Sequence, residues 1–179
     1  MKRSLPQGLY GITDTASGDP IRNGLALAKA GCPTVQLRAK GWSDGDTLLA
    51  AKELAAKLAP LGTCFIVNDH IDIAIASGAH GVHLGQDDGS IQDARKRVGP
   101  HMLIGWSTHT LAQAAGATGA DYIGFGPVYQ THSKTDALQP RGSSLLKEVV
   151  CTTRCPVVAI GGIEASVLHE VIATGVHGW

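Results

Sequence analysis

Short apolar segments alternate with longer amphipathic segments along the whole chain. The short segments are rich in β-branched and aromatic residues, which is typical of strands that are buried on both faces. Seven of them are expected to form strands: residues 8–13, 34–38, 64–67, 81–84, 102–105, 122–125 and 156–160. Because helical patterns lie between most of these segments, the alternation predicts a parallel sheet covered by helices.

Capping residues indicate where several helices begin. Asp19 followed by Pro20 is typical of an N-cap and a first helical position, and this helix is expected to end near Gly31. Ser43, with Asp46 three residues later, resembles a capping box. One face of the helix behind it carries the apolar residues Leu48, Ala51, Ala55 and Leu58. Further helices are expected at residues 71–77, 109–118 and 164–174.

A glycine precedes several of the expected strands in a loosely repeated phrase. It occurs at four places: Gly31, Gly78, Gly119 and Gly175. Such a glycine can end a helix and turn the chain into the next parallel strand. With residues 176–179 beginning an eighth strand, the repeated units favour an α/β fold of the TIM (β/α)8 barrel type. We expect one domain over residues 1–179, and a doubly wound open sheet is the alternative.

The composition is that of an ordinary soluble protein. The chain is 44% hydrophobic and 17% charged, and 15 Lys and Arg residues balance 15 Asp and Glu residues, so nothing attracts it generally to nucleic acid or anionic membranes. No apolar run approaches the ~20 residues of a membrane helix, and the N-terminus lacks the apolar part of a secretory signal. A cytoplasmic location and small-molecule partners are expected, and an oligomer is possible. Four cysteines without paired metal-binding spacing are expected to be reduced thiols: Cys32, Cys64, Cys151 and Cys155.

Two cations follow the second expected strand. In both candidate folds ligands bind at the carboxyl ends of the strands, so the residues found there carry the functional argument. Gln36, Arg38 and Lys40 combine an amide with two positive charges, which suits a polyanion such as pyrophosphate. A solvated basic turn is the alternative interpretation.

Carboxylates follow the third and fourth expected strands. Asn68 and Asp69 end the third, and Gln86, Asp87 and Asp88 follow the fourth. Oxygen ligands from two neighbouring strands suit Mg²⁺, which takes one or two carboxylates and completes its shell with water and substrate phosphates. Alternatively, these acids cap the helices that follow.

Anion-binding residue types follow the remaining strands. Ser107, after the fifth strand, could cap a helix or bind an anion. Gly161 and Gly162 are expected to open a helix where backbone N–H groups can approach an anion, a tight turn being the alternative. Four polar residues suited to phosphate lie on the loop after the sixth strand: Thr131, His132, Ser133 and Lys134.

Three aromatic side chains lie within or close to the expected strands. His83 lies within a strand and is expected to be a packed or hydrogen-bonded core residue rather than a catalytic one. Trp42 and Trp106 are close to strand ends, where they could wall a pocket.

Together these segments resemble the thiamine-phosphate synthase family. The matching segments occur in the family's order over nearly the whole chain: "LYGITD", "VQLRAK", "VNDHIDIAIASGAHGVHLGQDD", "IGWSTHT", "GADYIGFGPVYQTHSKTDA" and "PVVAIGGI". The resemblance implies a TIM barrel that joins 4-amino-5-hydroxymethyl-2-methylpyrimidine diphosphate to a thiazole phosphate. Pyrophosphate and thiamine phosphate would be the products, and loss of pyrophosphate would precede capture by the thiazole.

The resemblance also implies roles for particular residues. Mg²⁺ would be the cofactor, with Asp69 and Asp88 as its ligands. Arg38, Ser107 and Lys134 would be the catalytic residues. The pyrimidine diphosphate would be bound by Gln36, Leu37, Arg38, Ala39, Lys40, Asn68, Ser107 and Lys134. The thiazole phosphate would be bound by Thr131, His132, Ser133 and Gly162.

The chain departs from the family pattern in three ways. Ala39 stands where a Glu is usual, and Ser133 replaces a usual Thr while keeping the hydroxyl. The family continues beyond the position of Trp179, so we expect the barrel to lack the end of its eighth strand and its last helix, and to leave the first and seventh strands with an open edge.

Two other functions are considered. A thiazole tautomerase of the same superfamily uses a His where this chain has Pro127. The third possibility is a non-catalytic protein that binds thiamine precursors.

Overall fold

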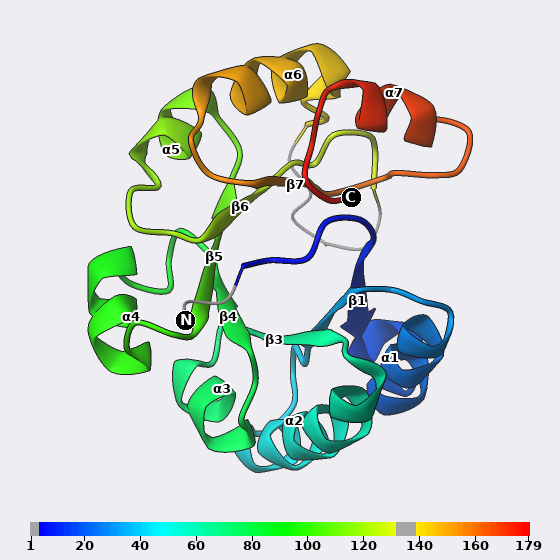
Figure 1. The fold of residues 1–179 in the computed structure, drawn as a ribbon, viewed down its shortest axis with the longest axis vertical. Helices are drawn as coiled ribbons and strands as arrows, with labels where there is room; N and C mark the ends of the chain where they lie inside the picture. Colours follow the sequence, from blue (N-terminus) through cyan, green and yellow to red (C-terminus); the bar gives the residue numbers. More distant parts are fainter. Residues whose placement is uncertain (1–3, 132–138) are drawn as a thin grey trace.

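Seven parallel strands pair in chain order within the residues that the computed structural model describes, 4–131 and 139–179. They are β1 (Tyr10–Asp14), β2 (Thr34–Arg38), β3 (Cys64–Asn68), β4 (Gly81–Leu84), β5 (Leu103–Thr108), β6 (Tyr122–Phe125) and β7 (Val157–Ala159). The α-helices are α1 (Pro20–Lys29), α2 (Asp44–Leu58), α3 (Ile71–Ser77), α4 (Ile91–Val98), α5 (Leu111–Gly116), α6 (Gly142–Thr152) and α7 (Leu168–Ala173). Two 3₁₀ turns complete the set, η1 (Thr15–Ser17) and η2 (Ala59–Leu61). The strands form an inner ring, and the helices lie outside it (Figure 1).

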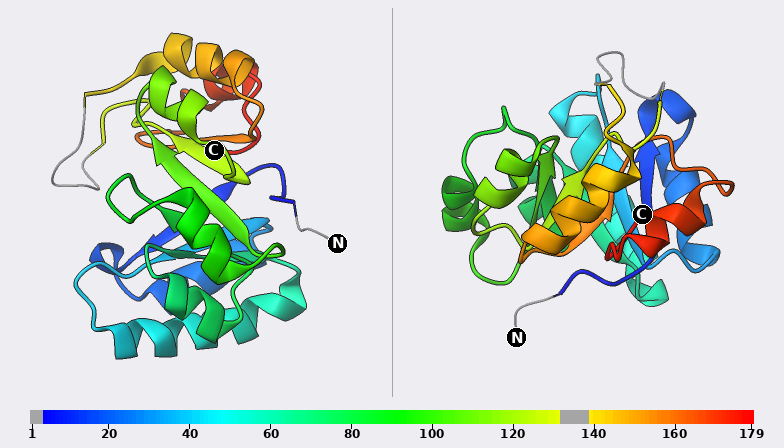
Figure 2. Two further views of the ribbon diagram at one scale, coloured as in Figure 1. Left: turned by 90° about the vertical axis from the view of Figure 1, so that its left-hand side faces the viewer. Right: turned by 90° about the horizontal axis from the view of Figure 1, so that it is seen from above.

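The last residues of the chain join the two edges of the sheet. Gly178 forms parallel bridges with Gly8 and with Val158. The N–H of Tyr10 donates to the carbonyl of Trp179 at 2.7 Å, and the N–H of Ala159 donates to the carbonyl of Gly178 at 2.8 Å. The N-terminal and C-terminal segments accordingly meet between β1 and β7 (Figures 1 and 2). The TIM-barrel prediction is confirmed and the open-sheet alternative is wrong. The expected open edge is partly closed, because residues 177–179 pair with the start of β1 and with β7.

Strand side chains alternate between two separate cores. Outward residues such as Val35, Leu37 and Phe65 are buried between the sheet and the helices. Inward residues such as Tyr10 and Tyr122 belong to a smaller core inside the ring. This alternation follows from the period of two along a strand, and it leaves the carboxyl ends of all the strands at one rim of the barrel.

Most helix boundaries follow the capping pattern. The side chain of Asp19 accepts hydrogen bonds from the N–H groups of Ile21 and Arg22, and Ser43 accepts one from Asp46. Gly78 ends α3 in the left-handed conformation, with a φ of 72°. These three capping predictions are confirmed.

The last helix begins later than expected. α7 starts at Leu168 instead of residue 164. Gly161 and Gly162 have φ values of 99° and 64°, which no α-helix contains, so the chain makes a turn there before the helix begins. The tight-turn interpretation of the two glycines is correct, and the expected helix start is wrong.

Two general expectations can be compared with the fold. The four cysteines are free thiols. No helix in the described ranges combines the length and the apolar character needed to cross a membrane.

A glycine on β5 makes room for two large polar side chains inside the barrel. A Cβ atom on Gly105 would overlap the ring of Tyr122 and the Nδ1 atom of His83. Both rings are nearly or fully buried, so neither can move aside into solvent. A glycine is therefore needed at position 105 because of side-chain packing, and not because of the backbone conformation.

We predict that Gly105→Ala lowers the free energy of unfolding by about 1–3 kcal/mol because it overpacks the inner core. Gly116→Ala is the matched control, since Gly116 lies in α5 and a Cβ atom added there meets nothing within 4 Å. Urea unfolding followed by circular dichroism would measure both variants. Equal stabilities would contradict the packing role of Gly105.

Candidate active site

A lysine and an aspartate from neighbouring strands form an ion pair at the carboxyl rim of the barrel. Lys40 follows β2 and Asp69 follows β3. Lys40 Nζ lies 3.1 Å from Asp69 Oδ2. The lysine side chain is 61% exposed, whereas that of the aspartate is 23% exposed, so the cation lies towards solvent. The basic segment is therefore part of a charged cluster rather than a turn that contacts only water.

The two predicted metal ligands lie close together. Asp88, in the loop after β4, accepts a hydrogen bond from the N–H of Gly85 at 2.6 Å. The pKa of its carboxyl is raised, first by loss of solvation and then by the nearby charge and hydrogen bond of Asp69, while the Gly85 N–H and Lys40 oppose the rise. The structure thus brings Asp69 and Asp88 to one place, where like charges repel.

Neither acid caps the helix that follows it. The N-cap of α3 is His70, which makes no side-chain capping bond. The N-cap of α4 is Ser90, whose hydroxyl accepts from the N–H of Asp93 at 3.0 Å. Asp87 is exposed and lies three residues before that cap, so its interpretation as a helix-start residue is wrong. The capping alternative is therefore contradicted for these acids.

The backbone of Asp69 has an unusual conformation. Its φ is 65°, in the left-handed region that residues other than Gly rarely occupy. Its N–H donates to the carbonyl of His83 at 2.8 Å, and the N–H of His70 donates to the carbonyl of Asn68 at 2.8 Å. These bonds hold the side chain of Asp69 at the rim despite the local cost, a pattern that is common at functional sites.

The donor set at this position fits Mg²⁺. Two carboxylates lie together, and the side chain of Asn68 precedes one of them at the end of β3. Among the described residues, no cluster of three or more His, Cys, Asp or Glu side chains is suited to a metal. Mg²⁺ does not need such a cluster, because it is commonly held by one or two carboxylates together with water and phosphate oxygens.

Arg38 is held by a partner that sequence reasoning missed. It forms an ion pair with Asp14, and both side chains are largely buried, at 17% and 15% exposure. The pairing register places Asp14 directly beside Arg38 at the ends of β1 and β2. Asp14 also accepts from the N–H of Ala16 at 2.8 Å, which fixes the carboxylate. The available signal was that Asp14 is the polar residue ending the first apolar strand.

Gln36 and Ser107 are tied to residues inside the barrel. Gln36 is 3% exposed, and its Nε2 donates to the hydroxyl of Tyr10 at 2.9 Å. The hydroxyl of Ser107 lies 2.9 Å from Nε2 of His83. Ser107 is not a helix cap, because Thr110 caps α5. The expectation that His83 is a hydrogen-bonded core residue is confirmed.

Two residues of the predicted diphosphate segment offer only their backbone. Leu37 is 1% exposed and Ala39 is 8% exposed. Both belong to the core between the sheet and the helices. Any contact between them and a ligand at the rim would therefore use their peptide groups.

The predicted thiazole-phosphate residues are only partly described. Thr131 is partly buried and lies after β6, whereas His132, Ser133 and Lys134 lie outside the described residues. Gly162 lies in the turn after β7, where an added Cβ would overlap the backbone of Tyr129 and Gln130. The glycine thus allows the β6 and β7 loops to approach closely, and the expected anion site at a helix start is not formed.

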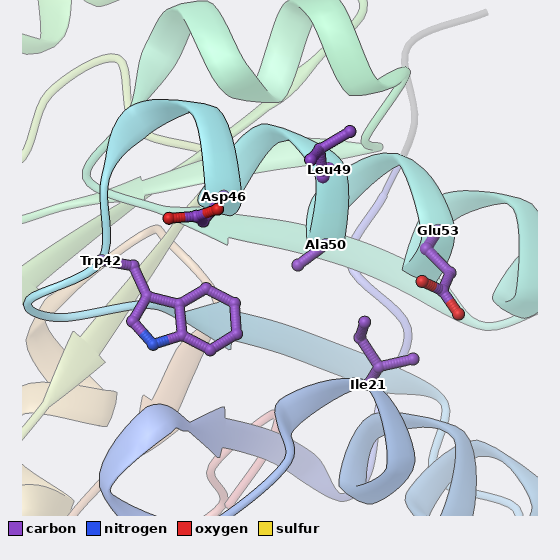
Figure 3. A pocket seen from close by; sticks show the side chains of 6 residues that line it. All are labelled: Ile21, Trp42, Asp46, Leu49, Ala50 and Glu53. Carbon is purple, nitrogen blue, oxygen red and sulfur yellow. The ribbon is translucent and has the colours of Figure 1, made fainter.

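An open hollow of about 350 Å³ lies outside this rim cluster. Figure 3 shows it between α1 and α2, with Trp42 and Ile21 facing it from either side. None of the predicted ligand-binding residues lines it. Trp106 is buried in the core between sheet and helices. Trp106 therefore does not wall the rim site.

Comparison with known proteins is consistent with this geometry. A family model described as "Thiamine monophosphate synthase" matches residues 9–179. A thiamine-phosphate synthase from Albidiferax ferrireducens is 41% identical over 175 residues, covering 95% of this chain and 80% of that protein. One from Shouchella clausii is 45% identical over 175 residues, covering 95% of this chain and 84% of that protein.

Solved structures extend the comparison to the fold. A thiamine phosphate pyrophosphorylase from Pyrococcus furiosus superposes with a TM-score of 0.88 at 34% identity, covering 97% of this chain and 83% of that chain. A 3-dehydroquinate dehydratase from Geobacillus kaustophilus gives a TM-score of 0.69 at 14% identity, covering 97% of this chain and 80% of that chain, and shares the fold alone.

If Asp69 binds Mg²⁺, the metal should raise the affinity of the chain for pyrophosphate. We predict that Asp69→Asn reduces this gain in affinity by about ten-fold or more, because the variant removes one of the two ligand charges. Asn tolerates the left-handed backbone, so the change tests charge rather than strain. Titration calorimetry with inorganic pyrophosphate, with and without Mg²⁺, would measure it. Asp87→Asn is the matched control and is expected to behave like the parent; an unchanged Mg²⁺ effect in Asp69→Asn would refute the metal assignment.

Proposed function

The chain belongs to the thiamine monophosphate synthase family of transferases, and from this premise we propose which reaction its rim residues carry out. The substrates are 4-amino-5-hydroxymethyl-2-methylpyrimidine diphosphate and 4-methyl-5-(2-phosphoethyl)thiazole or its carboxylate. The products are thiamine phosphate and pyrophosphate, and the carboxylate would in addition lose its carboxyl group as CO₂. The observation that carries the proposal is the rim cluster of Lys40, Asp69 and Asp88, which follow three consecutive strands. It supplies a cation for the diphosphate and two carboxylates for a divalent metal.

The diphosphate half of the site is assigned to β2, β3, β4 and β5. Arg38 and Lys40 bind the diphosphate oxygens, with Asn68 and Ser107 as hydrogen-bond donors. Asp69 and Asp88 would hold Mg²⁺, which supplies positive charge that stabilises the leaving pyrophosphate. The ion pair between Arg38 and Asp14 supports this assignment, because it fixes the guanidinium before any ligand arrives.

The reaction breaks one C–O bond and forms one C–N bond. As the bond between the pyrimidine methylene and the diphosphate breaks, its electron pair leaves with pyrophosphate. The aminopyrimidine stabilises the positive charge on the methylene, and the thiazole nitrogen then donates its lone pair to that carbon. No proton has to leave carbon, so the residues of the chain bind, orient and exclude water rather than act as a general base.

The other half of the site is assigned to the loops after β6 and β7. We assign the thiazole phosphate to Thr131, His132, Ser133 and Gly162, and a diphosphate contact to Lys134. The close approach of the turn containing Gly162 to the β6 loop supports a common binding surface from these two segments. Gln36, in the middle of β2, would contact the pyrimidine between the two halves.

The proposed function predicts thiamine phosphate formation only when the chain, both substrates and Mg²⁺ are all present. Chromatographic detection of thiamine phosphate together with a pyrophosphate assay would measure it. Isomerisation of the thiazole without the pyrimidine would favour a tautomerase. Mg²⁺-dependent binding of the pyrimidine diphosphate without product would favour a binding protein.

We predict that Lys40→Met raises the KM for the pyrimidine diphosphate by about ten-fold, because one charged contact to the leaving group is lost. The KM for the thiazole phosphate should stay within about two-fold of the parent, since the thiazole is assigned to other loops. Lys52→Met, at an exposed position on α2, is the matched control. Equal effects on both KM values would argue against a diphosphate contact for Lys40.

A further inference from the structure

A chain of hydrogen bonds crosses the interior of the barrel and links two residues of the proposed site. Gln36 Nε2 lies 2.9 Å from Tyr10 Oη, which lies 2.6 Å from Tyr122 Oη. Tyr122 Oη lies 3.1 Å from His83 Nδ1, and His83 Nε2 lies 2.9 Å from Ser107 Oγ. The chain thus joins β2, β1, β6, β4 and β5 in that order.

The three middle members of the chain are shielded from solvent. Tyr10 is 6% exposed, Tyr122 is 0% exposed and His83 is 8% exposed. Burial is the main cause that raises the pKa of both tyrosine hydroxyls, so each keeps its proton. Each phenol therefore has one proton to donate and must find an acceptor inside the barrel.

The space for this chain is provided by glycines on two strands. Gly105 on β5 lies against the rings of Tyr122 and His83, and Gly124 on β6 lies against the ring of His83, where an added Cβ would be 3.1 Å from Cε1. The two tyrosine rings also pack on each other with centroids 5.8 Å apart. The side chains are therefore held in one arrangement by packing as well as by hydrogen bonds.

The hydrogen bonds can all be satisfied in one direction. The amide nitrogen of Gln36 can only donate, so Tyr10 accepts from it and donates to Tyr122. Tyr122 then donates to Nδ1 of His83, which leaves the ring proton on Nε2 facing Ser107. Ser107 accepts from His83, so the proton of its own hydroxyl is free to point towards a ligand.

The opposite direction leaves a buried proton without an acceptor. If Ser107 donated to His83, then His83 would donate to Tyr122 and Tyr122 to Tyr10. With the nitrogen of the Gln36 amide facing it, Tyr10 would accept from two donors, and neither Gln36 Nε2 nor Tyr122 Oη could accept its own proton. Burial makes that arrangement unfavourable.

We propose that Tyr10, Tyr122 and His83 are positioning residues that make Ser107 a hydrogen-bond donor to the diphosphate. They also connect Ser107 to Gln36, the residue assigned to the pyrimidine of the same substrate. The part of this inference that concerns the diphosphate rests on the proposed function. The direction of the hydrogen bonds rests on the Gln36 amide facing Tyr10 with its nitrogen and on the burial of both phenols, and it can be tested without substrate.

The first experiment measures the tautomer of His83 in the folded protein without ligands. Long-range ¹H–¹⁵N NMR spectra of the imidazole should show a protonated Nε2 and an unprotonated Nδ1. Tyr122→Phe removes the donor to Nδ1, so the signal should move towards a mixture of tautomers. Tyr129→Phe is the matched control, because the hydroxyl of Tyr129 donates to Glu170 at 3.1 Å and is not part of the hydrogen-bond chain. This variant should leave the His83 signal unchanged. A protonated Nδ1 in the parent protein would overturn the proposal.

The second experiment asks whether Tyr122 acts through Ser107. Tyr122→Phe should lower kcat by about ten-fold while the KM for the thiazole phosphate stays within about two-fold. In a Ser107→Ala background the same substitution should change kcat by less than about two-fold, because the group that it orients is already absent. If Tyr122→Phe lowers kcat as much in the Ser107→Ala background as in the parent protein, the proposal is overturned.

Two further measurements keep the tests decisive. Tyr10→Phe is a second variant in case Tyr122→Phe does not fold, and it removes the hydroxyl that accepts from Gln36. It should also yield mixed His83 tautomers. An unchanged single tautomer in Tyr10→Phe would count against the proposal. If the parent protein makes no thiamine phosphate, the proposed function fails, and the NMR result still decides the direction of the hydrogen bonds. In that case, calorimetric binding of the pyrimidine diphosphate replaces kcat in the double-variant comparison.

Discussion

The interior of a closed parallel barrel is narrow, and side chains fill it completely. In this protein that limited volume holds an unusual share of polar groups, including two tyrosines and a histidine, within a small apolar core. They fit because the neighbouring strands carry Gly105 and Gly124 at the facing positions. They are stable there because each polar atom bonds to the next one, which removes the penalty of burying it alone. The same closure brings the carboxyl ends of all the strands to one rim, where the charged residues gather.

The rim is organised around compensated charge. Asp69 and Asp88 repel one another, and Lys40 and the N–H of Gly85 offset part of that repulsion. Arg38 is likewise matched by Asp14 at the ends of β1 and β2. Under the proposed function, a divalent cation would join the two carboxylates and the phosphates would join Arg38 and Lys40, so both kinds of charge at the rim would have partners.

Local patterns predicted the fold and the proximity of the charged strand-end residues better than the rest. The alternation of apolar segments and the caps at Asp19 and Ser43 depend on neighbouring residues, so they could be recognised in the sequence. The proximity of Asp69 and Asp88 could be predicted because parallel strands bring their ends together. The pairs Asp14–Arg38 and Tyr10–Tyr122 depend on strand register and on which residues face inward, and the tyrosines are 112 residues apart. The start of α7 was predicted incorrectly because the left-handed conformation of two glycines is decided by tertiary packing against the β6 loop.

Closure of the ring by the segment His177–Trp179 has a consequence for how the protein folds. The bridge between Gly8 and Gly178 joins residues from opposite ends of the chain, whereas every other strand pair joins neighbours in sequence. Local pairs can form as soon as two adjacent units exist, but this bridge requires almost the whole chain to be ordered first. During synthesis, this edge of β1 therefore stays unpaired until residues 177–179 have emerged from the ribosome, and an unpaired strand edge is open to wrong pairing.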